Sequence, residues 1–193
     1  SRIKWPIKIN NSHYGLVQGN VVFNGGGAGV ATEDGNESYN VIEQNAVFRI
    51  LGEGDREGIK SNGAFEPGSQ GIGLWFHGPN NYIRNNVAAN AVETTDESAY
   101  GFEFFQERVG DVRIPNFKGA DTSIAGQYTL RSVYGIPILE FSGNETYGNP
   151  QGITFWWVGI EWHTPYPVTE SVFKDMRIWH VSRYPVYGYH GNK

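Results

Sequence analysis

The sequence contains no cysteine and only one methionine among its 193 residues. The absence of cysteine excludes disulfides, thiolate nucleophiles and zinc–thiolate sites, so the fold does not depend on the redox state of its surroundings. This suits an exported protein, and we expect a secreted or cell-surface location.

Long apolar segments are also missing. No window approaches the roughly 18 apolar residues that a membrane-spanning helix needs, and the first six residues (SRIKWP) lack the basic-then-apolar layout of a signal peptide. We therefore expect no membrane insertion, and an export signal that has been removed or lies outside this segment.

Positive charge is scarce. The chain has 15 Lys and Arg against 20 Asp and Glu, a formal net charge of -5. No general basic field exists to hold a nucleic-acid backbone or an anionic membrane, so we expect no nucleic-acid partner.

Glycine is abundant and recurs in one context. There are 26 Gly, and at four places a Gly starts a short run with apolar residues at alternate positions, which is typical of a half-buried strand. No comparable run has helical spacing. The four runs begin at Gly29, Gly73, Gly101 and Gly152.

Asparagine marks a second repeated element, in which an apolar residue stands three positions before an Asn. The pairs are Val17 with Asn20, Ile42 with Asn45, Ile83 with Asn86, and Phe141 with Asn144. Asn tolerates the left-handed backbone conformation of a sharp corner, and stacked Asn side chains can hydrogen-bond from one coil to the next.

Together these elements describe a three-sided coil that buries its inward face only by stacking on its neighbours. We predict an all-β protein: a right-handed, single-stranded parallel β-helix of about four to five coils, with loops inserted chiefly at 52–70 and 109–132. Residues 1–193 form a single such segment, which we expect to be part of a longer solenoid. An antiparallel sandwich or barrel is the alternative.

Several motifs in order resemble the β-helix region of the cell-migration-inducing hyaluronidase family, which includes a transmembrane relative and fibrocystin-like proteins. They are residues 32–37 (TEDGNE), 40–42 (NVI), 74–76 (LWF), 78–85 (GPNNYIRN), 101–104 (GFEF) and 141–144 (FSGN). The resemblance runs from about 29 to 157. It implies a parallel β-helix on an extracellular protein whose relatives bind or cut hyaluronan, and it carries over no catalytic residue.

Aligning the glycine strands places their outward side chains in two columns. The first column is predicted to hold Ala31, Trp75, Glu103 and Thr154, and the second Glu33, His77, Phe105 and Trp156. Aromatic faces flanked by carboxylates bind sugars, so an exposed saccharide groove is one interpretation. The other is that inserted loops cover these aromatics, which then form a satellite core.

The candidate catalytic residues are Glu33, His77 and Glu103. Asp34 points away from its neighbour Glu33, and Glu33 could pair with Glu103 only if their coils were close neighbours. The candidate substrate-binding residues are Trp75, Arg84, Phe105, Trp156, Glu161 and His163.

The five histidines show no pair at metal-ligand spacing, so we expect no transition-metal site and no cofactor, with calcium at the acidic residues kept open. The glycine-rich stretch 24–29 lacks the Lys-Ser/Thr of a phosphate loop, and we expect it to form a tight corner. Asn10, Asn36 and Asn144 each begin a formal N-glycosylation motif.

The sequence thus predicts an extracellular β-helix that binds or processes polysaccharide. The mild acidity disfavours an anionic glycan unless Arg56, Lys60, Arg84 and Arg108 gather beside the groove. The residues do not decide whether the chain is an enzyme; if it is one, we expect a glycoside hydrolase or a polysaccharide lyase. The alternative is a structural or adhesive module with protein partners at the solenoid ends.

Overall fold

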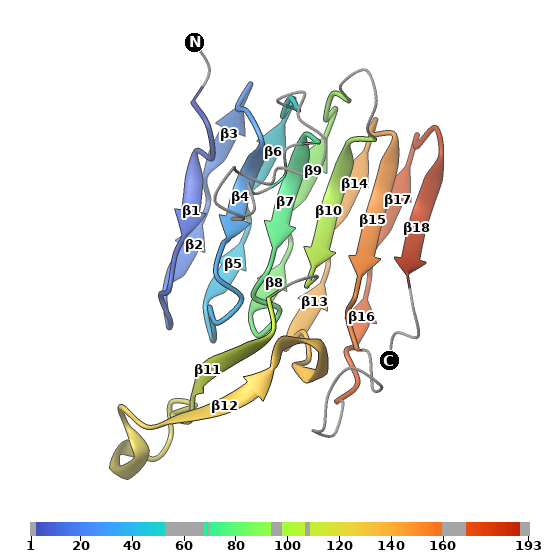
Figure 1. Cartoon of the computed structure of the whole chain (residues 1–193). Helices are drawn as coiled ribbons and strands as arrows, with labels where there is room; N and C mark the ends of the chain where they lie inside the picture. The colour runs from blue at the N-terminus through green and yellow to red at the C-terminus, as the bar shows by residue number, and fades with distance from the viewer. Residues whose placement is uncertain are drawn as a thin grey trace, which may run out of the picture.

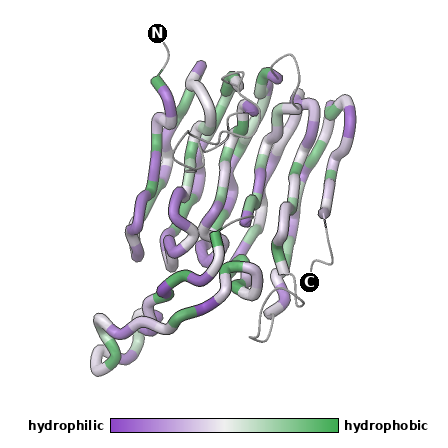
Figure 2. The backbone as a smooth tube through the Cα atoms, viewed as in Figure 1, coloured by the Kyte–Doolittle hydropathy of each residue, from purple (hydrophilic) through white to green (hydrophobic). Residues whose placement is uncertain are grey.

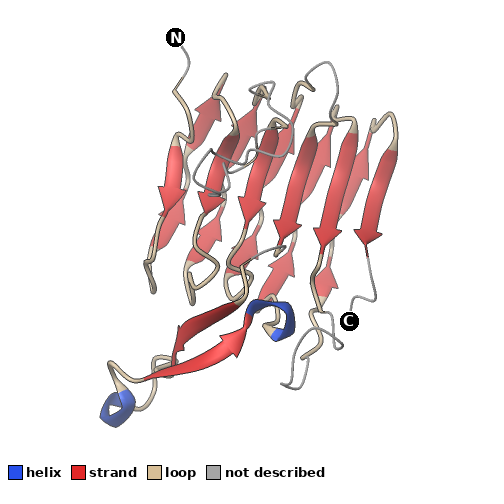
Figure 3. Ribbon diagram, viewed as in Figure 1, coloured by secondary structure: helices blue, strands red, loops and turns tan. Residues whose placement is uncertain are grey.

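The computed structural model of the chain describes residues 3–52, 68, 70–93, 98–106, 109–159 and 169–189. These residues form three parallel sheets wound around one axis, with an antiparallel hairpin projecting from one side (Figures 1 and 3). The chain is a parallel β-helix, as predicted. The antiparallel sandwich is wrong, because neighbouring strands in all three main sheets run in the same direction.

The first sheet contains the glycine strands. Its strands, in spatial order, are β1 (Ile7–Ile9), β4 (Ala28–Thr32), β7 (Ile72–Phe76), β10 (Tyr100–Phe105), β15 (Gln151–Trp156) and β18 (Tyr184–Tyr189). β4, β7, β10 and β15 each include one of the four predicted runs.

The asparagine elements supply the other two sheets. The second sheet holds β2 (Leu16–Gln18), β5 (Val41–Glu43), β8 (Tyr82–Arg84), β13 (Glu140–Ser142) and β16 (Phe173–Lys174). The third sheet holds β3 (Val21–Phe23), β6 (Ala46–Phe48), β9 (Val87–Ala89), β14 (Glu145–Tyr147) and β17 (Arg177–Trp179). One strand from each sheet makes a coil, so the described residues form five coils, and β18 begins another.

The core lies inside the coils and is built from columns of equivalent residues. In the second sheet, Ile42 is in register with Val17 on one side and Ile83 on the other, and Phe141 continues the column. Figure 2 shows hydrophobic residues interspersed with hydrophilic ones along the coils. Successive residues of a strand point to opposite faces, so alternate side chains of each strand enter this interior. Because each coil contributes a few core residues, burial depends on stacking.

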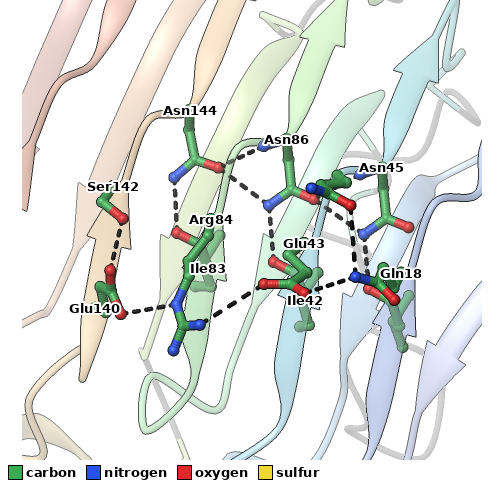
Figure 4. A network of polar contacts seen from close by, with 12 residues as sticks. Gln18, Ile42, Glu43, Asn45, Ile83, Arg84, Asn86, Glu140, Ser142 and Asn144 are labelled. Carbon is green, nitrogen blue, oxygen red and sulfur yellow. Dashed lines mark hydrogen bonds and ion pairs between the residues drawn. The ribbon is translucent and has the colours of Figure 1, made fainter.

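A ladder of asparagines holds the corner between the second and third sheets (Figure 4). Asn45 Nδ2 donates to Asn86 Oδ1 at 2.9 Å, and Asn86 Nδ2 donates to Asn144 Oδ1 at 3.0 Å. Each Nδ2 also donates to a backbone carbonyl of the preceding coil, as Asn86 does to Ile42 at 2.9 Å. The predicted coil-to-coil hydrogen bonding is confirmed. In the next coil, Met176 stands where the asparagine would be.

The left-handed backbone conformation lies one residue earlier than expected. Positive φ angles occur at Gly19 (68°), Gln44 (56°), Asn85 (52°) and Gly143 (64°), each directly before a ladder asparagine. The preceding residue therefore turns the corner, which leaves the ladder Asn free to point its amide inward.

The glycine that stands second in each of β4, β7, β10 and β15 is required by close packing inside the solenoid. A Cβ on Gly73 would lie 2.5 Å from the carbonyl oxygen of Gly101 and 2.7 Å from the Cβ of Ala88. A Cβ on Gly101 would overlap the Thr146 hydroxyl and approach the Gly152 oxygen to 2.9 Å. Any side chain here would push the first and third sheets apart.

The predicted insertion at 109–132 is a hairpin and not an irregular loop. β11 (Asp111–Pro115) pairs with β12 (Tyr128–Ser132) in antiparallel register, and a short 3-10 turn, η2 (Thr122–Ile124), lies between them. A second 3-10 turn, η3 (Val133–Gly135), follows β12. The hairpin returns to the first coil, where the Tyr14 hydroxyl donates to the Phe117 oxygen at 2.9 Å. Most of the insertion predicted at 52–70 lies outside the described residues.

Candidate functional site

The two predicted columns on the outward face of the first sheet are present. Trp75 is in register with Ala31 on one side and Glu103 on the other, and Glu103 is in register with Thr154. In the second column Phe105 is in register with Trp156. His77 follows Phe76 out of β7, and its backbone nitrogen donates to the Thr32 oxygen at 3.0 Å.

Burial contradicts the expectation of one open groove over both columns. The exposed fractions of Trp75, Glu103 and His77 are only 3%, 5% and 6%. Trp75 packs in a satellite core with Ala28, Ala31 and Ile72, against which Phe105 is partly buried. The satellite core of the alternative interpretation is therefore present in this half of the face. An outward position on a strand is exposed only where nothing packs over it, and strand periodicity does not report that packing.

A row of stacked aromatic rings continues across the sheet toward β18. The rings of Trp75 and Phe105 lie 6.2 Å apart at 25°, those of Phe105 and Trp156 lie 6.4 Å apart at 5°, and Trp156 lies 4.1 Å from Tyr189 at 10°. We call Phe105, Trp156, Tyr187 and Tyr189 the aromatic row. All four are half-buried, so this end of the face is accessible where the Trp75 end is closed.

The tyrosines of the aromatic row were missed as site residues. Tyr187 is in register with Thr154 and Tyr189 with Trp156, so they extend the first and second columns by one coil. The sequence does contain a pattern that could have identified them, because aromatic residues alternate with other residues in the run that ends at Tyr189.

His77 is buried between aromatic rings. Its ring centroid lies 4.3 Å from that of Trp75 and 5.9 Å from that of Phe105, and its Nδ1 lies 2.7 Å from the Glu33 carbonyl oxygen. Since a carbonyl oxygen only accepts, Nδ1 carries the proton. Burial lowers the pKa of His77 to about 4, although the Glu33 carbonyl opposes this shift. The imidazole is thus neutral at pH 7 and a weak base.

Glu33 and Glu103 are not arranged as a glycosidase pair. They lie two coils apart, on either side of β7, which corresponds to about 10 Å between their strands. A retaining or inverting pair needs its carboxyl groups roughly 5 to 9.5 Å apart. Moreover, Glu33 is held by Lys8 at 2.8 Å and by the Asn10 side-chain amide at 2.7 Å.

Arg84 lies on a different face from the aromatic residues. It projects outward from β8 in the second sheet, where its Nε binds Glu140 at 2.7 Å and its Nη1 lies 3.7 Å from Glu43 (Figure 4). It therefore does not join Trp75 and Phe105 in a common groove. Glu161 and His163, and the cationic candidates Arg56, Lys60 and Arg108, lie outside the described residues.

A buried carboxylate, Glu37, was not predicted as a special residue. It is fully buried and accepts hydrogen bonds from the backbone nitrogens of Asp34 (2.7 Å), Gly35 (2.9 Å) and Asn11 (3.2 Å). Burial raises the pKa of Glu37, while these hydrogen bonds oppose that rise. The contact with Asn11 joins the first two coils, so we assign Glu37 a structural role.

Within the described ranges, no group of three or more His, Asp or Glu side chains could hold a metal ion. No helix in that part of the chain is long and apolar enough to cross a membrane.

Comparison with known proteins gives a family match. The model of the CEMIP beta-helix family matches residues 6–153, which covers the first four coils and the start of β15. No curated protein and no solved structure matches the chain.

Proposed function

Because this chain belongs to the CEMIP beta-helix family, we propose that it is an extracellular β-helix that binds polysaccharide through the aromatic row on β10, β15 and β18. The observation that carries this proposal is the half-exposed, in-register stack of Phe105, Trp156 and Tyr189. Sugars pack their apolar faces on aromatic rings, and a row that follows the solenoid axis suits an extended chain.

The geometry favours binding over cleavage. Glu33 and Glu103 are separated by β7, and the burial that lowers the pKa of His77 makes it a poor proton acceptor at neutral pH. We therefore propose a binding role for the aromatic row and assign none of these three residues a catalytic step.

The charge of the chain bears on which polysaccharides it can bind. The chain carries a net charge of -5. Of the four cationic residues considered for the groove, Arg84 is the one that the structure describes, and it is already paired with glutamates on another sheet. A neutral or weakly charged polysaccharide thus fits the aromatic row better than a densely anionic one.

The test compares Trp156→Ala with Trp179→Ala by titration calorimetry against a panel of neutral and anionic polysaccharides. Trp179 is an exposed tryptophan of the third sheet, so its loss controls for a general effect of removing an indole. Binding should weaken at least tenfold in Trp156→Ala and stay unchanged in Trp179→Ala. Equal affinities in the two variants would overturn the proposal.

A second candidate function is association with another chain through β18. Val186 is in register with the core residue Ile153, yet it is 53% exposed, and Tyr184 is 54% exposed. Among the described residues, β15 is the one strand that pairs with β18. An uncovered strand edge favours strand addition by a partner. Sedimentation of the chain over a hundredfold concentration range should reveal dimers that Val186→Lys abolishes; a monomer throughout would exclude self-association.

A further inference from the structure

Three asparagines begin an N-glycosylation motif: Asn10, Asn36 and Asn144. The motif alone does not distinguish them. Their surroundings in the fold do, because a glycan is bulky and must leave the surface of the folded protein without displacing packed groups.

Asn144 cannot carry a glycan in the folded chain. It is 1% exposed and belongs to the asparagine ladder. Its Nδ2 donates to the Ile83 oxygen at 2.9 Å, and its Oδ1 accepts from Asn86 Nδ2 at 3.0 Å. A sugar on this nitrogen would have to enter the corner between two coils, so the ladder could not close.

Asn36 is half-buried and stands in a packed loop. Its carboxamide oxygen is buried, and its Nδ2 donates to Asn11 Oδ1 at 2.6 Å. The two residues that complete its motif, Glu37 and Ser38, are both fully buried. Asn36 therefore begins a motif whose other two residues are packed inside the protein, which leaves little room around it for a sugar.

Asn10 is different. It follows directly after β1, and Asn10, Asn11 and Ser12 are all exposed. The Asn10 Nδ2 makes one contact, with Glu33 Oε2 at 2.7 Å, and the amide nitrogen of a glycosylated asparagine keeps one hydrogen with which to make it. The Ser12 hydroxyl donates to the Asn10 oxygen at 2.8 Å and stays at the surface.

We propose that Asn10 is an N-glycosylation site, and that it alone of the three motifs is compatible with a glycan on the folded chain. This inference rests on the extracellular location proposed above. In the reaction, Asn10 Nδ2 loses one proton to a base of the transferase and forms a bond to the anomeric carbon of an oligosaccharide. The bond from that carbon to a lipid diphosphate breaks, and the lipid diphosphate leaves.

A glycan on Asn10 would lie away from the aromatic row that we propose as the polysaccharide-binding surface. Asn10 lies beside β1 and β4, whereas the aromatic row lies on β10, β15 and β18 at the other side of the first sheet (Figure 1). A glycan on Asn10 would therefore cover the first coils and leave the aromatic row accessible.

The experiment expresses the chain in eukaryotic cells behind a cleavable signal peptide. Peptide N-glycosidase treatment in H2(18)O, followed by peptide mapping, marks each asparagine that carried a glycan. Peptides are mapped both for the chain secreted into the medium and for the chain retained inside the cells. The glycosylation of chain that fails to be secreted is therefore also measured. Ser12→Ala and Ser12→Thr are the matched variants, because the first removes the motif and the second keeps it without changing Asn10.

We expect one glycan on the secreted chain, on Asn10, absent from Ser12→Ala and present in Ser12→Thr. Any glycan on Asn36 or Asn144 should be confined to chain retained in the cells. Unmodified Asn10 in both fractions, or a secreted chain glycosylated at Asn144 or Asn36, overturns the proposal. Polysaccharide binding by the deglycosylated chain is measured separately, so failure here is distinct from failure of the binding role.

Discussion

Asn86 and Asn144 lie one coil apart, and the Oδ1 of Asn144 accepts from both the backbone nitrogen and the Nδ2 of Asn86, at 2.9 and 3.0 Å. The Asn86 side chain thereby links three successive coils, because its own Oδ1 accepts from Asn45 Nδ2 at 2.9 Å. The polar groups of this corner satisfy one another inside the protein, where water does not reach them.

Replacing Asn86 by alanine should destabilise the fold by about 3 kcal/mol or more, since donors of Asn45 and acceptors of the adjoining coils lose their partners in a buried place. Urea unfolding followed by circular dichroism measures the loss. Asn20→Ala is the matched control: Asn20 ends the ladder, is half-buried and gives up one side-chain bond to Asn45, so about 1 kcal/mol is expected. Similar losses for both variants would argue against cooperation along the ladder.

Gly101→Ala should destabilise the chain by more than about 3 kcal/mol or prevent folding, because the added Cβ overlaps the Thr146 hydroxyl in a rigid interior. Gly126→Ala tests whether the loss of stability comes from crowding by the added Cβ or from replacing any glycine. Gly126 has a φ of 80° with open space around it, so only conformational strain of about 1 to 2 kcal/mol applies. Thermal unfolding of the two variants separates these effects, and a tolerated Gly101→Ala would contradict the close approach of the sheets.

Stability should fall as the pH drops from about 6.5 toward 4, in part because of His77. Burial lowers the pKa of His77 to about 4 in the folded chain from 6.5. The unfolded chain therefore binds a proton that the folded chain rejects, and acid favours unfolding by up to about 3 kcal/mol.

His77→Phe should flatten this pH dependence, measured as the difference in unfolding free energy between pH 7.5 and 4.5. Burial raises the pKa of Glu37, which acts in the opposite direction, but this effect is common to both proteins and cancels in the comparison. His180→Gln is the control, since His180 is exposed. An unchanged slope in His77→Phe would show that His77 does not contribute.

Arg84→Met should change stability by no more than about 1 kcal/mol and should leave polysaccharide affinity unchanged. Its partners Glu43 and Glu140 are partly exposed, and ion pairs of this kind contribute little. The Ser142 hydroxyl is the main cause that keeps the pKa of Glu140 below its usual range, so this carboxylate stays ionised without Arg84. A loss of binding in Arg84→Met would place the ligand on the second sheet instead of the first.

Much of the architecture could be predicted because a solenoid repeats a local pattern. Gly73 and Asn86 mark where a strand starts and where a corner turns, and each has an equivalent in four of the five coils. Once the glycines were aligned, the registers of Trp75 with Glu103 and of Phe105 with Trp156 followed from strand geometry alone. The hairpin at 109–132 could not be predicted in this way, because it lies outside the repeat.

The sequence by itself determined the winding of the chain and the neighbours of each strand residue, since these depend on short-range backbone preferences that glycine, asparagine and alternating apolar residues express directly. Only the tertiary structure decided which outward residues meet solvent. Trp75, His77 and Glu103 are closed off, while Trp156 and Tyr189 remain half-exposed, and Arg84 lies on another face altogether. The exposure of an outward side chain depends on what packs over it from elsewhere in the chain, and a local sequence pattern does not predict that packing.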